Sequence, residues 1–151
     1  MNFDDESPML HGHWTLDVYD GDVQTPETFI ERIEGDNLFL TVGKGMMMDR
    51  LYGLSGVGAM TRTGVGTSAT AAAPGDTALT GGVFKAFDSA ATRAGLVVTS
   101  VSTFGTADAN ISWNELALDN GTMLLNRIAP IGPFAKTSAV SIVVTVQVTQ
   151  S

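Results

Sequence analysis

Apolar and polar residues alternate along several short stretches of the chain, as expected for half-buried β-strands. The longest alternating stretch is residues 138–149, where Val or Ile occupies every second position from 140 to 148. Residues 13–19 follow the same pattern, with Trp14, Leu16 and Val18 on one side. Both segments are therefore predicted to be strands with one face in the core.

Other apolar runs between turn residues are predicted to be strands as well. They are residues 37–42, 59–66, 82–87, 95–104, 110–118 and 121–128. Residues 27–34 fit a strand or a short helix. Turns are predicted at residues 20–22, 43–45 and 119–121, which contain Gly, Asp, Asn or Lys. About eight strands predict an all-β protein, a β-sandwich or jelly-roll-like pair of antiparallel sheets.

One short helix is predicted at residues 46–54, because Met and Leu favour helices. Met47, Leu51 and Leu54 would share one face of it, and Gly53 and Gly56 would end it. The run Met46–Met48 is interpreted as core filling. Its alternative is interface packing, because methionine adapts to uneven partners.

The predicted domain organisation is an extended N-terminal arm, residues 1–12, followed by a single β-sandwich domain, residues 13–151. The arm is polar and contains Pro8. Within the domain, residues 67–76 are rich in Ala and Thr and are predicted to form a long surface loop.

Composition excludes several classes of protein. The 151 residues contain no cysteine, so disulfides and thiolate metal sites are ruled out. No apolar run approaches the roughly 18 residues of a membrane span. Residues 1–49 carry a net charge of −9 and residues 50–151 a net charge of +1. A basic surface is missing, so nucleic-acid binding is not expected.

Five segments, in order, resemble a module found in structural proteins of tailed bacteriophages. They are residues 63–68 (TGVGTS), 74–79 (PGDTAL), 111–118 (ISWNELAL), 121–127 (GTMLLNR), and Lys136-Thr137 followed by the alternating final strand. The similarity covers more than half of the chain. It departs from the family pattern at Ala117, where glycine is usual, and at residues 149–151, which replace an aromatic ending.

The resemblance implies a non-enzymatic virion protein. The compact size favours a capsid decoration (cement) protein that stabilises the head shell, as a homotrimer bound to the major capsid protein on the outer surface of the head. It would be made in the host cytoplasm. The alternative is a tail-fibre or tail-adaptor protein. The arm, residues 1–12, is a candidate anchor that orders on docking.

Three groups of residues suggest a ligand site, but each has a simpler interpretation. His11 and His13 would share a strand face, yet no third metal ligand is evident. A cation-binding loop is suggested by Asp17, Asp20 and Asp22. The further ligands that such a loop needs are missing at the right spacing, so an acidic turn is expected. The Gly-rich segments at residues 53–58 and 64–67 lack the Lys and helix of a phosphate site. No metal, cofactor or catalytic residue is therefore predicted.

Glu115 and Arg127 form the candidate structural pair. The two residues lie on neighbouring strand segments, so a partly buried, bidentate ion pair is predicted between them. A catalytic role for Glu115 is not expected, because no motif supplies a second carboxylate and residues 50–151 contain no histidine.

Overall fold

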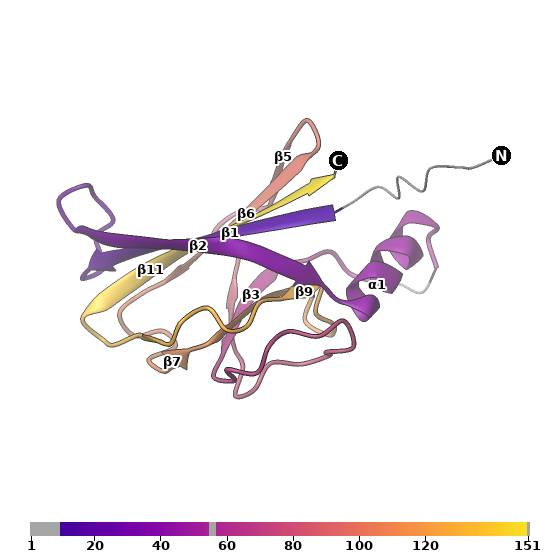
Figure 1. The fold of residues 1–151 in the computed structure, drawn as a ribbon. Coiled ribbons are helices and arrows are strands. Elements are labelled where there is room, and N and C mark those ends of the chain that lie inside the picture. The colour runs from indigo at the N-terminus through magenta and orange to yellow at the C-terminus, as the bar shows by residue number, and fades with distance from the viewer. Residues whose placement is uncertain (1–9, 55–56, 151) are drawn as a thin grey trace.

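The computed structural model describes residues 10–54 and 57–150, which form an all-β protein with one short helix, as predicted (Figure 1). Within these residues, six strands form a large antiparallel sheet in the order β5-β6-β11-β1-β2-β9. Its strands are β5 (Thr92–Ala94), β6 (Val97–Phe104), β11 (Val140–Gln150), β1 (Leu10–Asp20), β2 (Phe29–Phe39) and β9 (Asn126–Arg127).

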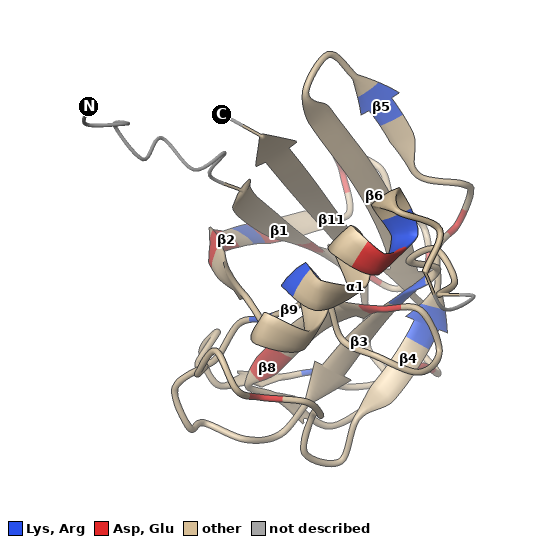
Figure 2. Ribbon diagram, turned by 90° about the vertical axis from the view of Figure 1, so that its right-hand side faces the viewer, with Lys and Arg blue, Asp and Glu red and all other residues tan. Residues whose placement is uncertain are grey.

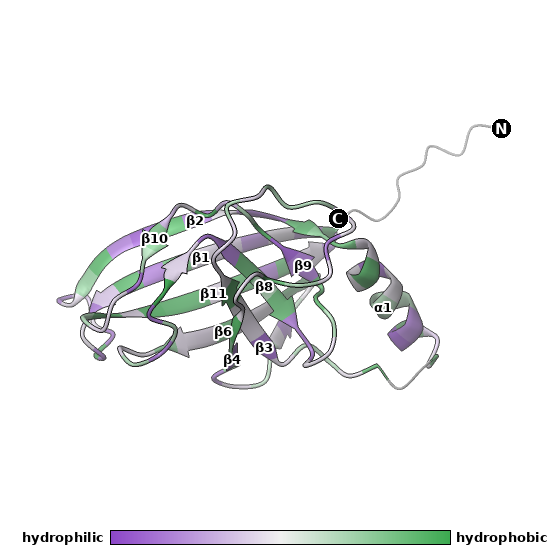
Figure 3. Cartoon of the chain, turned by 90° about the horizontal axis from the view of Figure 1, so that it is seen from below, coloured by the Kyte–Doolittle hydropathy of each residue, from purple (hydrophilic) through white to green (hydrophobic). Residues whose placement is uncertain are grey.

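The alternating pattern sets the register at the centre of this sheet. Opposite Trp14, Leu16 and Val18 of β1 lie Val146, Val144 and Ile142 of β11. All six side chains are buried. A shift of one residue would turn each apolar face outward, so this register is strongly specified. The hydrophobic segments of the large sheet are seen from the side of the smaller strands in Figure 3.

The smaller sheets cover one face of the large sheet. One sheet consists of β4 (Val83–Ala86), β3 (Arg62–Gly66) and β8 (Glu115–Asp119), in that order. A short pair consists of β10 (Phe134–Ala135) and β7 (Ser112–Trp113). The hydrophobic core combines residues of both layers, and Phe104 of β6 meets Trp113 edge to face at 4.9 Å between ring centroids.

The strands β1, β2 and β9 differ in extent from the prediction. Residues 10–12, assigned to the arm, belong to β1, while residues 1–9 lie outside the described residues. The ambiguous segment 27–34 is part of a strand, because β2 runs from Phe29 to Phe39. The strand predicted at residues 121–128 is reduced to β9, and the chain before it bends at Gly121, whose φ is +96°.

The helix α1 (Thr41–Leu51) begins five residues earlier than predicted. Consequently the turn predicted at residues 43–45 is wrong, and so is the end of the preceding strand at Val42. Gly53 follows the helix with a φ of +65°, as expected for a residue that ends a helix, and Gly56 lies outside the described residues. Among the described residues, no helix is long and apolar enough to cross a membrane.

The predicted apolar face of the helix is also wrong. Met47, Leu51 and Leu54 are 37%, 76% and 58% exposed, whereas the buried residues of α1 are Gly43 and Met46. Only the first of the three consecutive methionines fills the core, because Met48 is 53% exposed.

Candidate functional site

Glu115 and Arg127 are joined at the centre of a buried polar network. Leu116 and Ile128 exchange two backbone hydrogen bonds of 3.0 and 2.8 Å, which brings the neighbouring Glu115 and Arg127 together. Arg127 Nε donates to Glu115 Oε2 at 2.8 Å. Both side chains are almost completely buried, with 1% of Glu115 and 5% of Arg127 exposed.

The contact differs from the predicted bidentate pair, because Arg127 divides its donors among three acceptors. Its Nη1 donates to Asp76 Oδ2 at 2.7 Å, and its Nη2 donates to the carbonyl oxygen of Thr70 at 3.1 Å. We call Glu115, Arg127 and Asp76 the loop clamp. The low-complexity loop after β3 supplies Asp76 and Thr70, and the sequence pattern gave no sign of either contact.

The second carboxylate oxygen of Glu115 holds both ends of the same loop. Oε1 accepts hydrogen bonds from the backbone N–H of Ser68 at 2.8 Å and of Thr80 at 3.0 Å. Both oxygens of Glu115 are therefore engaged away from solvent, an arrangement that holds the loop against β8.

Gly66 is required beside the loop clamp. It lies opposite Glu115 in the pairing of β3 with β8. A Cβ at this position would lie 2.7 Å from Glu115 Oε1 and 2.9 Å from the carbonyl oxygen of Thr80. Gly64 and Gly66 lie in β3, where they admit side chains from neighbouring strands.

A second polar cluster surrounds Lys136, which the sequence singles out only as part of a segment that resembles the phage module. Only 3% of Lys136 is exposed, and its Nζ donates to the carbonyl oxygen of Gly105 at 2.8 Å and to Asn110 Oδ1 at 2.9 Å. Burial lowers the pKa of Lys136, an effect that the negative charges of Asp108 and Asp22 oppose. These hydrogen bonds fix the conformation of the loop between β6 and β7.

Acid is expected to weaken this cluster. The ion pair with Lys85, at 2.6 Å, holds the pKa of Asp108 below its ordinary value of 3.8, and the N–H of Gly105 adds to this effect. A carboxylate whose pKa is lower in the folded than in the unfolded protein stabilises the fold at neutral pH. This contribution is lost as the pH falls from the ordinary pKa of 3.8 through the lower pKa of Asp108 in the folded protein. The melting temperature of Asp108→Asn should therefore lie below that of the wild type at pH 7, and the difference between the two melting temperatures should be smaller at pH 3. Equal differences at pH 7 and pH 3 would contradict this prediction.

The histidine and aspartate groups are engaged in separate local contacts. His13 Nδ1 lies 3.1 Å from Asp36 Oδ1 of the adjacent strand. Asp17 binds Arg32 through two contacts of 2.6 and 2.8 Å. Asp22 accepts from the N–H and hydroxyl of Thr106, both at 2.7 Å. In the described ranges, no group of three or more His, Cys, Asp or Glu residues is placed to hold a metal ion.

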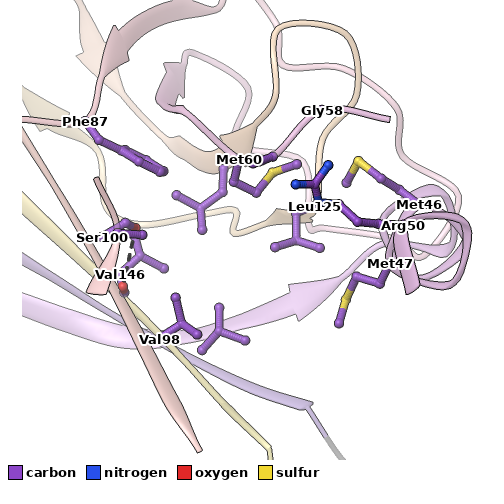
Figure 4. A pocket seen from close by; sticks show the side chains of 14 residues that line it. Met46, Met47, Arg50, Gly58, Met60, Phe87, Val98, Ser100, Leu125 and Val146 are labelled. Carbon is purple, nitrogen blue, oxygen red and sulfur yellow. Dashed lines mark hydrogen bonds between the residues drawn. The ribbon is translucent and has the colours of Figure 1, made fainter. Parts of the chain in front are cut away.

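An apolar cavity lies between α1 and the inner face of the large sheet (Figure 4). Its volume is about 260 Å³. Met46 and Met47 line it from the helix, and Val98 and Val146 line it from the sheet. Arg50 lies at its helix side, where Nη1 donates to the carbonyl oxygen of Val57 at 2.8 Å.

A larger cavity, of about 830 Å³, shares Met47 with the first. It lies where β1, β2 and β11 approach α1, and its lining includes Leu10, Leu38, Met48 and Leu51. We call the two cavities together the sheet–helix groove. Its combined lining is mostly apolar, and the basic side chains in it, Lys44 and Arg50, belong to α1.

Most of the exposed large apolar side chains of the described residues form two groups, and the others are Leu38, Val83, Leu96 and Val98. One group surrounds the β1–β2 hairpin loop and consists of Val23, Phe29 and Ile30. The other group, on and after α1, consists of Met47, Met48, Leu51, Tyr52 and Leu54. Since β1 and β2 run between these two places, the groups are separated by the length of the strands (Figure 1).

Comparison of the chain with protein-family models, curated proteins and solved structures finds no match.

Proposed function

We propose that the protein is a non-enzymatic structural component of a tailed-bacteriophage virion, and that it acts by binding copies of itself and neighbouring virion proteins. The main support from the structure is the presence of two separate groups of exposed apolar side chains, one around the β1–β2 hairpin loop and one on and after α1. Large apolar patches are uncommon on isolated soluble proteins and are typical of surfaces that bind other proteins.

The loop clamp adds support from the part of the chain that resembles the phage module. Arg127 and Glu115 belong to two of the resembling segments, and Asp76 belongs to a third. Their contacts hold a long loop against the sheet. Such a clamp suits a protein whose function depends on a fixed shape.

Within a virion, we propose a capsid decoration role, with a homotrimer bound to the major capsid protein on the outside of the head. Other copies of the chain and the shell would cover the two exposed apolar groups, and burial of these side chains would stabilise the trimer and its attachment to the shell. Reinforcement of the shell would then come from contacts that bridge neighbouring capsid subunits.

Copy number tests this proposal. Gel densitometry of purified virions from the phage that encodes the protein should give hundreds of copies, in a fixed ratio to the major capsid protein. A handful of copies would favour a tail-fibre or tail-adaptor protein instead. Absence from purified virions would overturn the structural role.

A further inference from the structure

We propose that the sheet–helix groove binds residues 1–9 of a second copy of this chain. The groove is a preformed, mostly apolar site, and its larger cavity falls within the range of roughly 300–1,000 Å³ that is typical of binding pockets. The contact rests on the self-association proposed above, but it does not require attachment to a capsid.

The chemistry of residues 1–9 matches that of the groove. The segment contains Phe3 and Met9, which suit an apolar lining, and between them the acidic run 4–6. Lys44 and Arg50 are exposed on the groove's helix, and Figure 2 shows both basic and acidic segments on α1, where Asp49 is the acidic residue. The exposed Lys44 and Arg50 give the helix side of the groove two charges that complement the acidic run 4–6.

The lining of the larger cavity includes Asn37, which carries an unpaired amide. Its Oδ1 and Nδ2 are buried and have no hydrogen-bond partner among the described residues. The amide lies over Gly12 of β1, since a Cβ on that glycine would overlap it. Burial of such a group without a partner costs free energy, and rotation of the side chain toward an extended peptide in the groove would let it pair with the N–H and C=O of the peptide.

The self-association proposed above favours a second copy over the same chain. Leu10 pairs with Gln150, and Gly12 pairs with Asn37, so the strand that follows the segment is fixed from its first residue. Leu10 also lines the larger cavity, so binding of the segment within its own chain is the competing arrangement that the test must exclude.

An extended segment of nine residues spans roughly 30 Å, which is enough to reach a neighbouring domain. Each copy would then give one segment and receive one. This is a head-to-tail contact, which closes into a ring when the rotation between copies allows it. A trimer is one such ring.

The proposal is tested with two variants, each of which lacks one half of the contact. Deletion of residues 1–9 removes the donated segment, and Met47→Asp places a charge in the groove at a position that is already partly exposed. Light scattering on size-exclusion chromatography should show oligomers for the wild-type protein and monomers for each variant alone. An equimolar mixture of the variants should regain association, because one supplies the groove and the other the segment.

Other results would overturn the proposal. Simple packing of α1 against α1 predicts that the deletion variant still associates and that the mixture does not rescue Met47→Asp. Binding of the segment within its own chain predicts a wild-type monomer. Leu51→Asp, at a residue that is 76% exposed, should repeat the result of Met47→Asp. The matched control is Val83→Asp on β4, at a residue that is 36% exposed and belongs to neither exposed apolar group, and it should still associate.

A synthetic peptide of residues 1–9 provides a direct measurement. Calorimetry should show that it binds the deletion variant, and a peptide of the same composition in scrambled order should bind more weakly. The double variant Lys44→Glu/Arg50→Glu should bind the peptide roughly tenfold more weakly, as expected for the loss of two exposed ion pairs. Equal affinity for both peptides would contradict a specific site.

Discussion

Arg127→Met is expected to lower the free energy of unfolding by about 3–5 kcal/mol, the usual cost of removing one partner from a buried ion pair. The reason is that Glu115 is 1% exposed and would lose the guanidinium that pairs with its buried carboxyl group. Asp76 would also lose its contact with Arg127 Nη1. Urea unfolding followed by tryptophan fluorescence measures the change, because Trp113 is buried in the same layer.

The matched control is Arg32→Met, which removes a geometrically better pair from the surface. Arg32 meets Asp17 through two nitrogen atoms, at 2.6 and 2.8 Å, but 56% of its side chain is exposed. Water and salt screen such pairs, so the loss of stability should be much smaller than for Arg127→Met. Equal losses for the two variants would contradict the importance assigned to burial.

A second measurement separates the loop clamp from a general loss of packing. Glu115 Oε1 accepts from the N–H groups of Ser68 and Thr80. In Glu115→Gln, one oxygen is replaced by an amide NH₂, which cannot accept hydrogen bonds. The single remaining oxygen cannot serve both Arg127 Nε and the N–H groups of Ser68 and Thr80, and the charge-assisted bond to Arg127 draws it away from the loop. Amide hydrogen exchange at Ser68 and Thr80 should therefore accelerate more than exchange in β1 and β11. Uniform acceleration across the domain would indicate global unfolding instead.

Alternation along the chain predicted the central strands because their two faces have different surroundings. Positions 14, 16 and 18 face the core, while 15, 17 and 19 are only partly buried. This contrast is a local property, so it can be recognised without knowing the partner strand. It also specifies the register between β1 and β11, in which buried residues face buried residues.

The loop clamp could be predicted only in part, because its members are far apart in sequence. Glu115 and Arg127 belong to neighbouring segments, so their contact was accessible from the pattern. Asp76 lies 51 residues from Arg127, in a loop whose composition indicates only exposure. Lys136 is a similar case, since no local pattern shows that a lysine will be buried against backbone carbonyl groups.

The helix was placed incorrectly because propensity favours methionine and leucine over glycine. Residues 43–45 contain two glycines, so a turn was the local expectation. The structure shows a tertiary reason for one of them: Gly43 is buried against the backbone of Leu125. Close approach of the helix to this segment outweighs the cost of glycine in a helix.

Two glycine substitutions in α1 are therefore expected to change stability in opposite directions. At Gly43, an added Cβ would overlap the backbone carbonyl group of Leu125, so Gly43→Ala should destabilise the protein by roughly 1–3 kcal/mol, as other overpacked sites do. At Gly45, nothing lies within 4 Å of an added Cβ. Gly45→Ala should therefore stabilise the helix by about 0.5–1 kcal/mol.

Differential scanning calorimetry of the two variants tests both the position of α1 and its contact with Leu125. If residues 43–45 formed a turn, neither substitution would gain helix stability and Gly43→Ala would meet no backbone. A lower melting temperature for Gly43→Ala with a higher one for Gly45→Ala is the result that only the observed helix explains. Because α1 forms one wall of the sheet–helix groove, Gly43→Ala should also weaken binding of the peptide of residues 1–9, whereas Gly45→Ala should not.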